Sequence, residues 1–110
     1  MFTESEIADV MAEMVGRIVA RFHPERIILF GSRAGGKPGR DSDIDLLVVM
    51  PVEGSRREMA NKIDLALADR SIPLDVIVVT PEQFARQMNI MGTIVREAVR
   101  GGRVVYEHAA

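Results

Sequence analysis

The chain has 110 residues, of which 47% are hydrophobic and 27% charged, with a net charge of −2 at pH 7. This length fits a single domain over residues 1–110, and the balance is that of a globular protein, which excludes a largely disordered chain. No apolar run approaches the roughly 18 residues that cross a bilayer, the lack of cysteine excludes disulfides and fits a reducing cytoplasm, and the negative charge argues against direct nucleic-acid binding.

The N-terminal segment predicts a long helix over residues 3–22, because its apolar residues recur at helical spacing. Thr3 and Glu6 form a predicted capping box at its start. The pair His23-Pro24 ends it, since the residue before a proline avoids the helical region. A short apolar strand follows over residues 26–30.

A polar, glycine-rich loop over residues 31–42 separates this strand from a second one over residues 44–50, which Pro51 stops. A second helix is expected from Ser55 to about Arg70, with Ser55 and Glu58 as another capping box.

The last third of the chain predicts a strand over residues 74–79 and a helix beginning at Thr80 and Pro81. A further helix over residues 93–100 ends at Gly101-Gly102, and residues 103–107 form an edge strand. The order αββαβααβ predicts an α+β fold, a single mixed sheet of about four strands with helices packed on it.

The first strand runs directly into Gly31-Ser32. Glycine allows the backbone to approach a ligand closely, and serine adds a hydroxyl beside free N–H groups. Small residues and free amides suit an anionic phosphate chain.

Asp43 and Asp45 stand two apart at the start of the second strand, so both carboxylates lie on one face. Two neighbouring carboxylates repel each other and need a counter-charge. Mg²⁺ prefers oxygen ligands, takes one or two carboxylates, and completes its shell with water and substrate phosphate.

Asp75 opens the otherwise apolar third strand, where a carboxylate needs an explanation. The short 31–42 loop favours antiparallel pairing of the first two strands, and the helical crossover allows parallel pairing of the second and third. With these pairings Gly31-Ser32, the aspartate pair and Asp75 meet at one edge of the sheet.

Gly31-Ser32, ten intervening residues and then Asp43-Ile44-Asp45 resemble the signature of the polymerase-β-like nucleotidyltransferase superfamily. The continuation SDIDLLVV and the C-terminal Gly-Gly-Arg-Val-Val-Tyr-Glu are similar to the minimal nucleotidyltransferases (MNT) of bacteria and archaea. The resemblance covers nearly the whole chain and implies the palm-like nucleotidyltransferase fold. Asp75 stands where the family places its third carboxylate.

The resemblance implies transfer of a nucleoside monophosphate, most simply AMP from ATP, to an acceptor hydroxyl. Asp43, Asp45 and Asp75 would be the catalytic and metal-binding residues, holding two Mg²⁺ ions, and Asp75 would also activate the hydroxyl. The implied nucleotide-binding residues are Gly31, Ser32, Arg33 and Ser42, with Lys37 and Arg40 as weaker candidates in the same loop.

The resemblance also implies a partner. MNT proteins are commonly antitoxins paired in hetero-oligomers with a helical HEPN-type ribonuclease toxin, and they modify a toxin tyrosine with AMP. Two other functions stay open: a non-catalytic antitoxin that neutralises its partner by occlusion, and a transferase for a small molecule such as an aminoglycoside.

Other conspicuous residues have ordinary structural explanations. Tyr106 is expected to pack on the edge strand. The methionines at 88 and 91, with Ile90, fit either the core or an adaptable surface for a partner, and the core is favoured. Arg56, Arg57 and Lys62 give the second helix a mildly basic face, which is expected to be solvated.

Overall fold

The computed structural model describes residues 3–31, 34 and 43–108. The expectations for Ser32, Arg33, Lys37, Arg40 and Ser42 fall outside these residues. The elements are α1 (Glu4–Phe22), β1 (Arg26–Phe30), β2 (Ile44–Val49), α3 (Arg56–Ala66), β3 (Leu74–Val79), α4 (Pro81–Gln87), α5 (Ile94–Gly101) and β4 (Arg103–Glu107). Their order confirms the predicted α+β arrangement.

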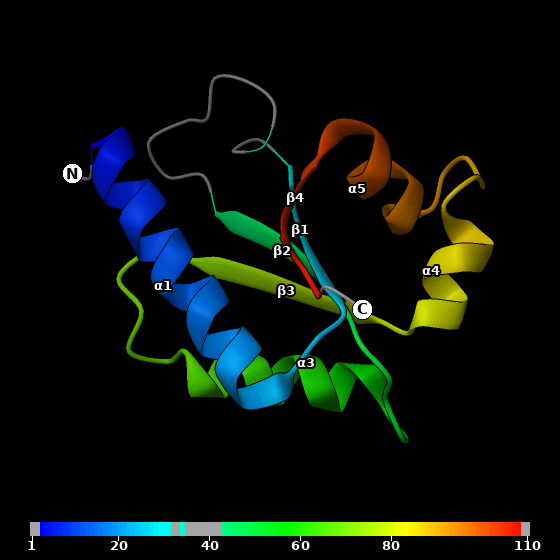
Figure 1. Ribbon diagram of the computed structural model, residues 1–110, viewed down its shortest axis with the longest axis horizontal. Helices are drawn as coiled ribbons and strands as arrows, with labels where there is room; N and C mark the ends of the chain where they lie inside the picture. Colours follow the sequence, from blue (N-terminus) through cyan, green and yellow to red (C-terminus); the bar gives the residue numbers. More distant parts are fainter. Residues whose placement is uncertain (1–2, 32–33, 35–42, 109–110) are drawn as a thin grey trace.

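The four strands form one mixed sheet in the order β3-β2-β1-β4 (Figure 1). The central pair β1 and β2 is antiparallel, β2 and β3 are parallel, and β4 adds antiparallel to the other side of β1. Both strand pairings predicted around the glycine-rich loop are therefore confirmed. The sheet leaves β3 and β4 as its two edges.

Helices cover both faces of the sheet (Figure 1). On one face α1 and α3 pack on alternate strand residues such as Ile27, Leu46 and Val78, together with Ile18 of α1 and Ile63 of α3. On the other face α4 and α5 pack on the intervening strand residues. These are Ile28, Leu47, Val49 and Val79, and they contact Phe84, Val95 and Ala98. Because alternate side chains point to opposite faces, β2 is apolar on both.

The helix starts follow the predicted capping residues. The Thr3 hydroxyl accepts a hydrogen bond from the Glu6 N–H, and the Glu6 carboxylate accepts one from the Thr3 N–H, both at 3.1 Å. At α3 the Ser55 hydroxyl accepts from the Glu58 N–H at 3.1 Å, which makes it a simple N-cap rather than the predicted capping box.

The helix α3 ends at Ala66, four residues before the predicted end at Arg70. The Leu67 N–H lies 3.1 Å from the Asp64 carbonyl and 3.2 Å from that of Ile63, so the last turn tightens. The Arg70 guanidinium then donates to the Leu67 and Asp64 carbonyls at 3.0 and 3.2 Å. A residue predicted to extend the helix instead folds back and satisfies its free C-terminal carbonyls.

Arg17 ties α1 to the end of α3. Its guanidinium donates to the Ala66 carbonyl at 2.8 Å and pairs with the Asp69 carboxylate at 2.9 Å. The bond from Arg17 to the Asp69 carboxylate holds the pKa of Asp69 below its ordinary value.

Among the described residues, no helix combines the length and the apolar character needed to cross a bilayer.

The junction of α5 and β4 depends on a close backbone approach at Gly102. A Cβ there would meet the Ala98 carbonyl oxygen, lie 2.5 Å from the Leu29 carbonyl oxygen, and lie 3.0 Å from the Ile28 side chain. Two of these atoms are backbone and cannot turn away. At the neighbouring Gly101, which is helical, a Cβ would meet nothing within 4 Å.

We therefore expect opposite effects from two adjacent substitutions. Gly102→Ala should lower the free energy of unfolding by about 1–3 kcal/mol because the added methyl group is overpacked. Gly101→Ala should raise it by roughly 0.5–1 kcal/mol, since alanine is the better helix former. Urea unfolding measures both, and equal effects of the two variants would contradict the close approach at Gly102.

Candidate functional site

The pairing of three strands brings Gly31, Asp45 and Asp75 to one end of the sheet. Asp45 on β2 is the register partner of Asp75 on the parallel strand β3. Asp45 is also the register partner of Phe30 on β1, the residue before Gly31. Adjacent strands lie about 4.8 Å apart, so the two carboxylates and the glycine are direct neighbours.

These aspartates lie on the face of the sheet that α4 and α5 cover. By strand alternation Asp45 shares its face with Leu47, and Asp75 shares its face with Ile77, both of which pack in the core of that side. The helices do not bury the acidic end: Asp43 and Asp75 are exposed, and Asp45 is partly buried. A ligand can therefore reach the carboxylates from solvent.

Gly31 is the tightest point of the site. Its φ of +77° lies in the left-handed region, and a Cβ built on it would overlap the Asp45 carboxylate. The Ala34 N–H donates to the Gly31 carbonyl at 3.1 Å. The sequence predicted close approach of the backbone at Gly31 to a ligand, and the structure shows a close neighbour within the chain itself, the Asp45 carboxylate.

The electrostatics of the site centre on Asp45. Its pKa is raised above the ordinary value, first because burial disfavours the charged form, and then because Asp75 and Asp43 carry like charges. Asp75 and Asp43 therefore add to the cost of ionising Asp45. A cation bound among them would relieve this repulsion.

The donor set fits a hard divalent cation such as Mg²⁺. The available groups are carboxylate oxygens at an accessible sheet end, and Mg²⁺ needs only one or two of them, beside water and phosphate. Within the described ranges, no group of three or more histidine, aspartate or glutamate side chains is close enough to hold a metal by itself. Asp45 and Asp75 form the close pair, and Asp43 acts on Asp45 through its charge.

The burial predicted for several residues outside the site is confirmed in part. Tyr106 is partly buried against the core, as expected. Met88 packs against the core of the α4 and α5 face, but Ile90 is 48% exposed and Met91 is 82% exposed, so their predicted burial is wrong. These two residues lie in the turn between α4 and α5, where the chain leaves the sheet.

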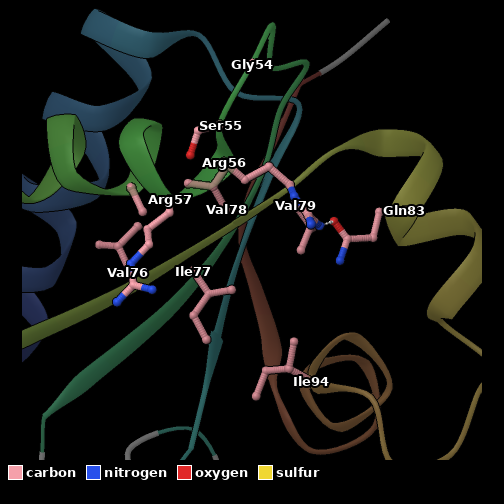
Figure 2. Close-up of a pocket in the computed structure, with 11 residues that line it drawn as sticks. Gly54, Ser55, Arg56, Arg57, Val76, Ile77, Val78, Val79, Gln83 and Ile94 are labelled. Carbon is pink, nitrogen blue, oxygen red and sulfur yellow. Dashed lines mark hydrogen bonds between the residues drawn. The ribbon is translucent and has the colours of Figure 1, made fainter.

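The sequence missed a groove beside the edge strand β3. The groove has a volume of about 590 Å³ and is lined by Gly54, Ser55, Arg56, Arg57, Ala60, residues 76–79, Gln83 and Ile94 (Figure 2). The Arg56 guanidinium donates a hydrogen bond to the Gln83 side chain and so links α3 to α4. No local sequence signal marks this groove, because its walls come from four separate elements.

The raised pKa of Asp45 makes stability depend on pH in a defined direction. The folded state binds the Asp45 proton more tightly than the unfolded state, so the contribution is most favourable at low pH and is lost as pH rises through the folded-state pKa. Asp45→Asn removes the repelling charge. The variant should therefore melt at a higher temperature than the parent protein at pH 7 without divalent cations.

Thermal melts with and without Mg²⁺ test this expectation. Mg²⁺ should raise the melting temperature of the parent protein more than that of Asp45→Asn, because a bound ligand stabilises the folded state. The exposed residue Asp9 of α1 supplies a control. Asp9→Asn should melt at the same temperature as the parent protein, both with and without Mg²⁺. A lower melting temperature for Asp45→Asn in the metal-free buffer would contradict the repulsion.

Comparison with solved structures finds similar chains, and those with TM-scores of 0.52 and 0.54 share the fold of this chain. A complex described as a toxin–antitoxin with AMP-PNP matches with a TM-score of 0.54 at 22% identity, over 88% of this chain and 73% of that one. The toxin–antitoxin MntA-HepT matches with a TM-score of 0.52 at 18% identity, over 92% and 73%. A tri-AMPylated Shewanella oneidensis HEPN toxin in complex with an MNT antitoxin matches with a TM-score of 0.41 at 21% identity, over 96% and 70%.

Comparison with curated proteins gives no match. The family comparison is decisive, because the model of the nucleotidyltransferase domain matches residues 6–101. That range contains α1 from its third residue, every element from β1 to α5, and all three aspartates of the site. The chain belongs to the nucleotidyltransferase domain family.

Proposed function

We propose that this nucleotidyltransferase transfers AMP from ATP to a tyrosine hydroxyl of a partner protein, a helical HEPN-type toxin that it holds in a hetero-oligomer and neutralises. The observation that carries the proposal is the Asp45–Asp75 pair, in register on adjacent strands and closed on the third side by Gly31. Neighbouring carboxylates at an open end of a sheet suit a divalent cation, and a reaction on the phosphates of a nucleotide uses such a cation.

Each aspartate of the site would have a role in this reaction. The acceptor oxygen attacks the α-phosphorus of ATP, the bond to the pyrophosphate oxygen breaks, and the acceptor proton passes to a base for which Asp75 is the candidate. Asp43, Asp45 and Asp75 would hold Mg²⁺, which neutralises charge on the phosphates. Burial and the nearby charge of Asp75 disfavour the ionised form of Asp45. A cation bound beside Asp45 would offset this free-energy cost.

The nucleotide is expected to lie against Gly31, at the end of β1. Gly31 would let the phosphates approach the backbone, Ser32 and Arg33 would bind phosphate oxygens, and Ser42 would orient Asp43. Support for ATP comes from the neighbour described with AMP-PNP, an ATP analogue, and support for a toxin partner comes from the neighbour described as MntA-HepT. Both are similar to this chain in fold.

A transfer assay tests the proposal. The chain is incubated with Mg²⁺, ATP labelled in its α-phosphate, and each protein encoded beside it. Label should appear on one of these proteins and should vanish with the double variant Asp43→Ala/Asp45→Ala, while Asp9→Ala should keep full activity because Asp9 lies exposed on α1.

The outcomes separate the remaining functions. If the double variant silences its partner as well as the parent does and nothing is labelled, the chain acts by occlusion and the proposed transfer is wrong. If label appears only on an added aminoglycoside, the acceptor is a small molecule. Label that persists in the double variant would remove the aspartates from the mechanism.

A second prediction concerns the contact between Gly31 and Asp45. Gly31→Ala combines a positive φ with a clash against the carboxylate, whereas Gly92→Ala has a φ of +87° and no atom within 4 Å. Backbone strain should cost each variant about 1–2 kcal/mol of stability. Only Gly31→Ala should also lose the stabilisation by Mg²⁺ and ATP, as measured by the shift in melting temperature; an equal loss in Gly92→Ala would contradict the contact.

A further inference from the structure

The groove beside β3 begins directly after the acidic end of that strand. Its lining includes residues 76–79, the four residues that follow Asp75. On one side it is bounded by the start of α3, and on the other by Gln83 of α4 and Ile94 of α5 (Figure 2). The groove therefore leads along the edge of the sheet to Asp75.

The edge of β3 offers unpaired backbone groups to this groove. The Ile44 N–H donates to the Pro73 carbonyl at 2.9 Å, and the Met50 N–H donates to the Val79 carbonyl at 3.0 Å. Because successive residues of a strand bond to opposite sides, the odd-numbered residues of β3 face β2. The N–H and C=O groups of Val76 and Val78 consequently face the free edge, since within the described residues β3 pairs with β2 alone.

The walls of the groove are basic and contain no acidic side chain. Arg56 and Arg57 occupy the first turn of α3, where a positive charge is unfavourable beside the helix dipole. Within the described residues, neither arginine takes part in an ion pair. In Figure 2 the Arg56 side chain extends towards Gln83, and the Arg57 side chain extends the other way, towards Val76. This local positive charge stands in a chain whose net charge is −2.

We infer that the groove binds an extended, acidic segment of the protein that accepts the nucleotide, and that this segment adds to the sheet as a strand beside β3. The inference rests on the proposed transfer to a protein. A neighbouring strand lies about 4.8 Å away, and residues directly opposite each other share a face of the sheet. A tyrosine opposite Asp75 therefore projects its hydroxyl on the side of the Asp75 carboxylate.

The same register places the other residues of the bound segment opposite the residues of β3. Two residues from the tyrosine, an apolar side chain lies opposite Ile77 and beside Ile94. Further along the segment, an acidic residue comes level with Arg56, whose side chain extends towards Gln83, whereas Arg57 lies on the Val76 side, nearer the tyrosine. Backbone hydrogen bonds to Val76 and Val78 supply the binding, and the charges supply the choice of segment.

Synthetic peptides test this inference directly. The probes are Tyr-Thr-Val-Thr-Glu-Asp-Glu, its reversed sequence for the opposite strand direction, and Tyr-Thr-Val-Thr-Lys-Lys-Lys as the charge control. Hydrogen exchange is followed at single amides. One of the acidic peptides should slow exchange at Val76 and Val78 by about tenfold when present at about ten times its Kd. Ile77 should not change, because its amide already faces β2.

Charge reversal provides the matched variants. Arg56→Glu/Arg57→Glu should weaken binding of the acidic peptide by roughly tenfold and raise KM for AMP transfer to it, with kcat unchanged. Glutamates suit the first turn of a helix, so this variant should fold. Lys62→Glu changes an exposed charge of α3 outside the groove and should have no effect.

The inference is overturned if no peptide protects Val76 and Val78, or if the lysine peptide protects them as well as the acidic ones do. It is also overturned if the arginine variant binds the acidic peptide as the parent protein does. The proposed transfer is judged separately, by stabilisation of the chain with Mg²⁺ and ATP. If that stabilisation is present and the edge amides stay unprotected, the acceptor enters by another route.

Discussion

The parallel register of β2 and β3 is the constraint on which the site depends. It sets Asp45 against Asp75, and the antiparallel partner β1 brings Gly31 against the same carboxylate. The ionised form of Asp45 is disfavoured here, first by burial and then by the like charges of Asp75 and Asp43, which raises the pKa of Asp45. The carboxylates stay together because residues on both faces of β2 are buried, so the strand cannot slip by one position without exposing its core.

The apolar core around the sheet therefore supplies the stability that offsets the electrostatic penalty of ionising Asp45. The residues after Asp45 on β2 are all buried, and α1, α3, α4 and α5 pack on the two faces. The acidic end remains open to solvent, where cations and phosphates can reach it. This division between a rigid apolar middle and a repelling polar end is typical of sites whose stabilising partner is a ligand.

The edge position of β3 gives the same strand a second use. One side of β3 bonds to β2 and fixes Asp75, and the other side presents the backbone of Val76 and Val78 to a groove with two arginines. Exposed strand edges invite pairing with other chains, and proteins usually block them. Within the described residues this edge is left open directly beside the acidic end, and the proposed strand addition rests on that neighbourhood.

The sequence by itself determined the elements, their order and the candidate carboxylates, because helix caps, apolar periods and the spacing of Asp43 and Asp45 are local signals. It misjudged the end of α3, where Arg70 folds back onto the carbonyls of its own helix, and the exposure of Ile90 and Met91. Only the tertiary structure decided that Asp45 and Asp75 are in register, that Gly31 touches Asp45, and that Arg56 and Arg57 border the edge of β3. These relations join residues distant in the chain, and they are set by how the sheet and helices pack together, which no local pattern encodes.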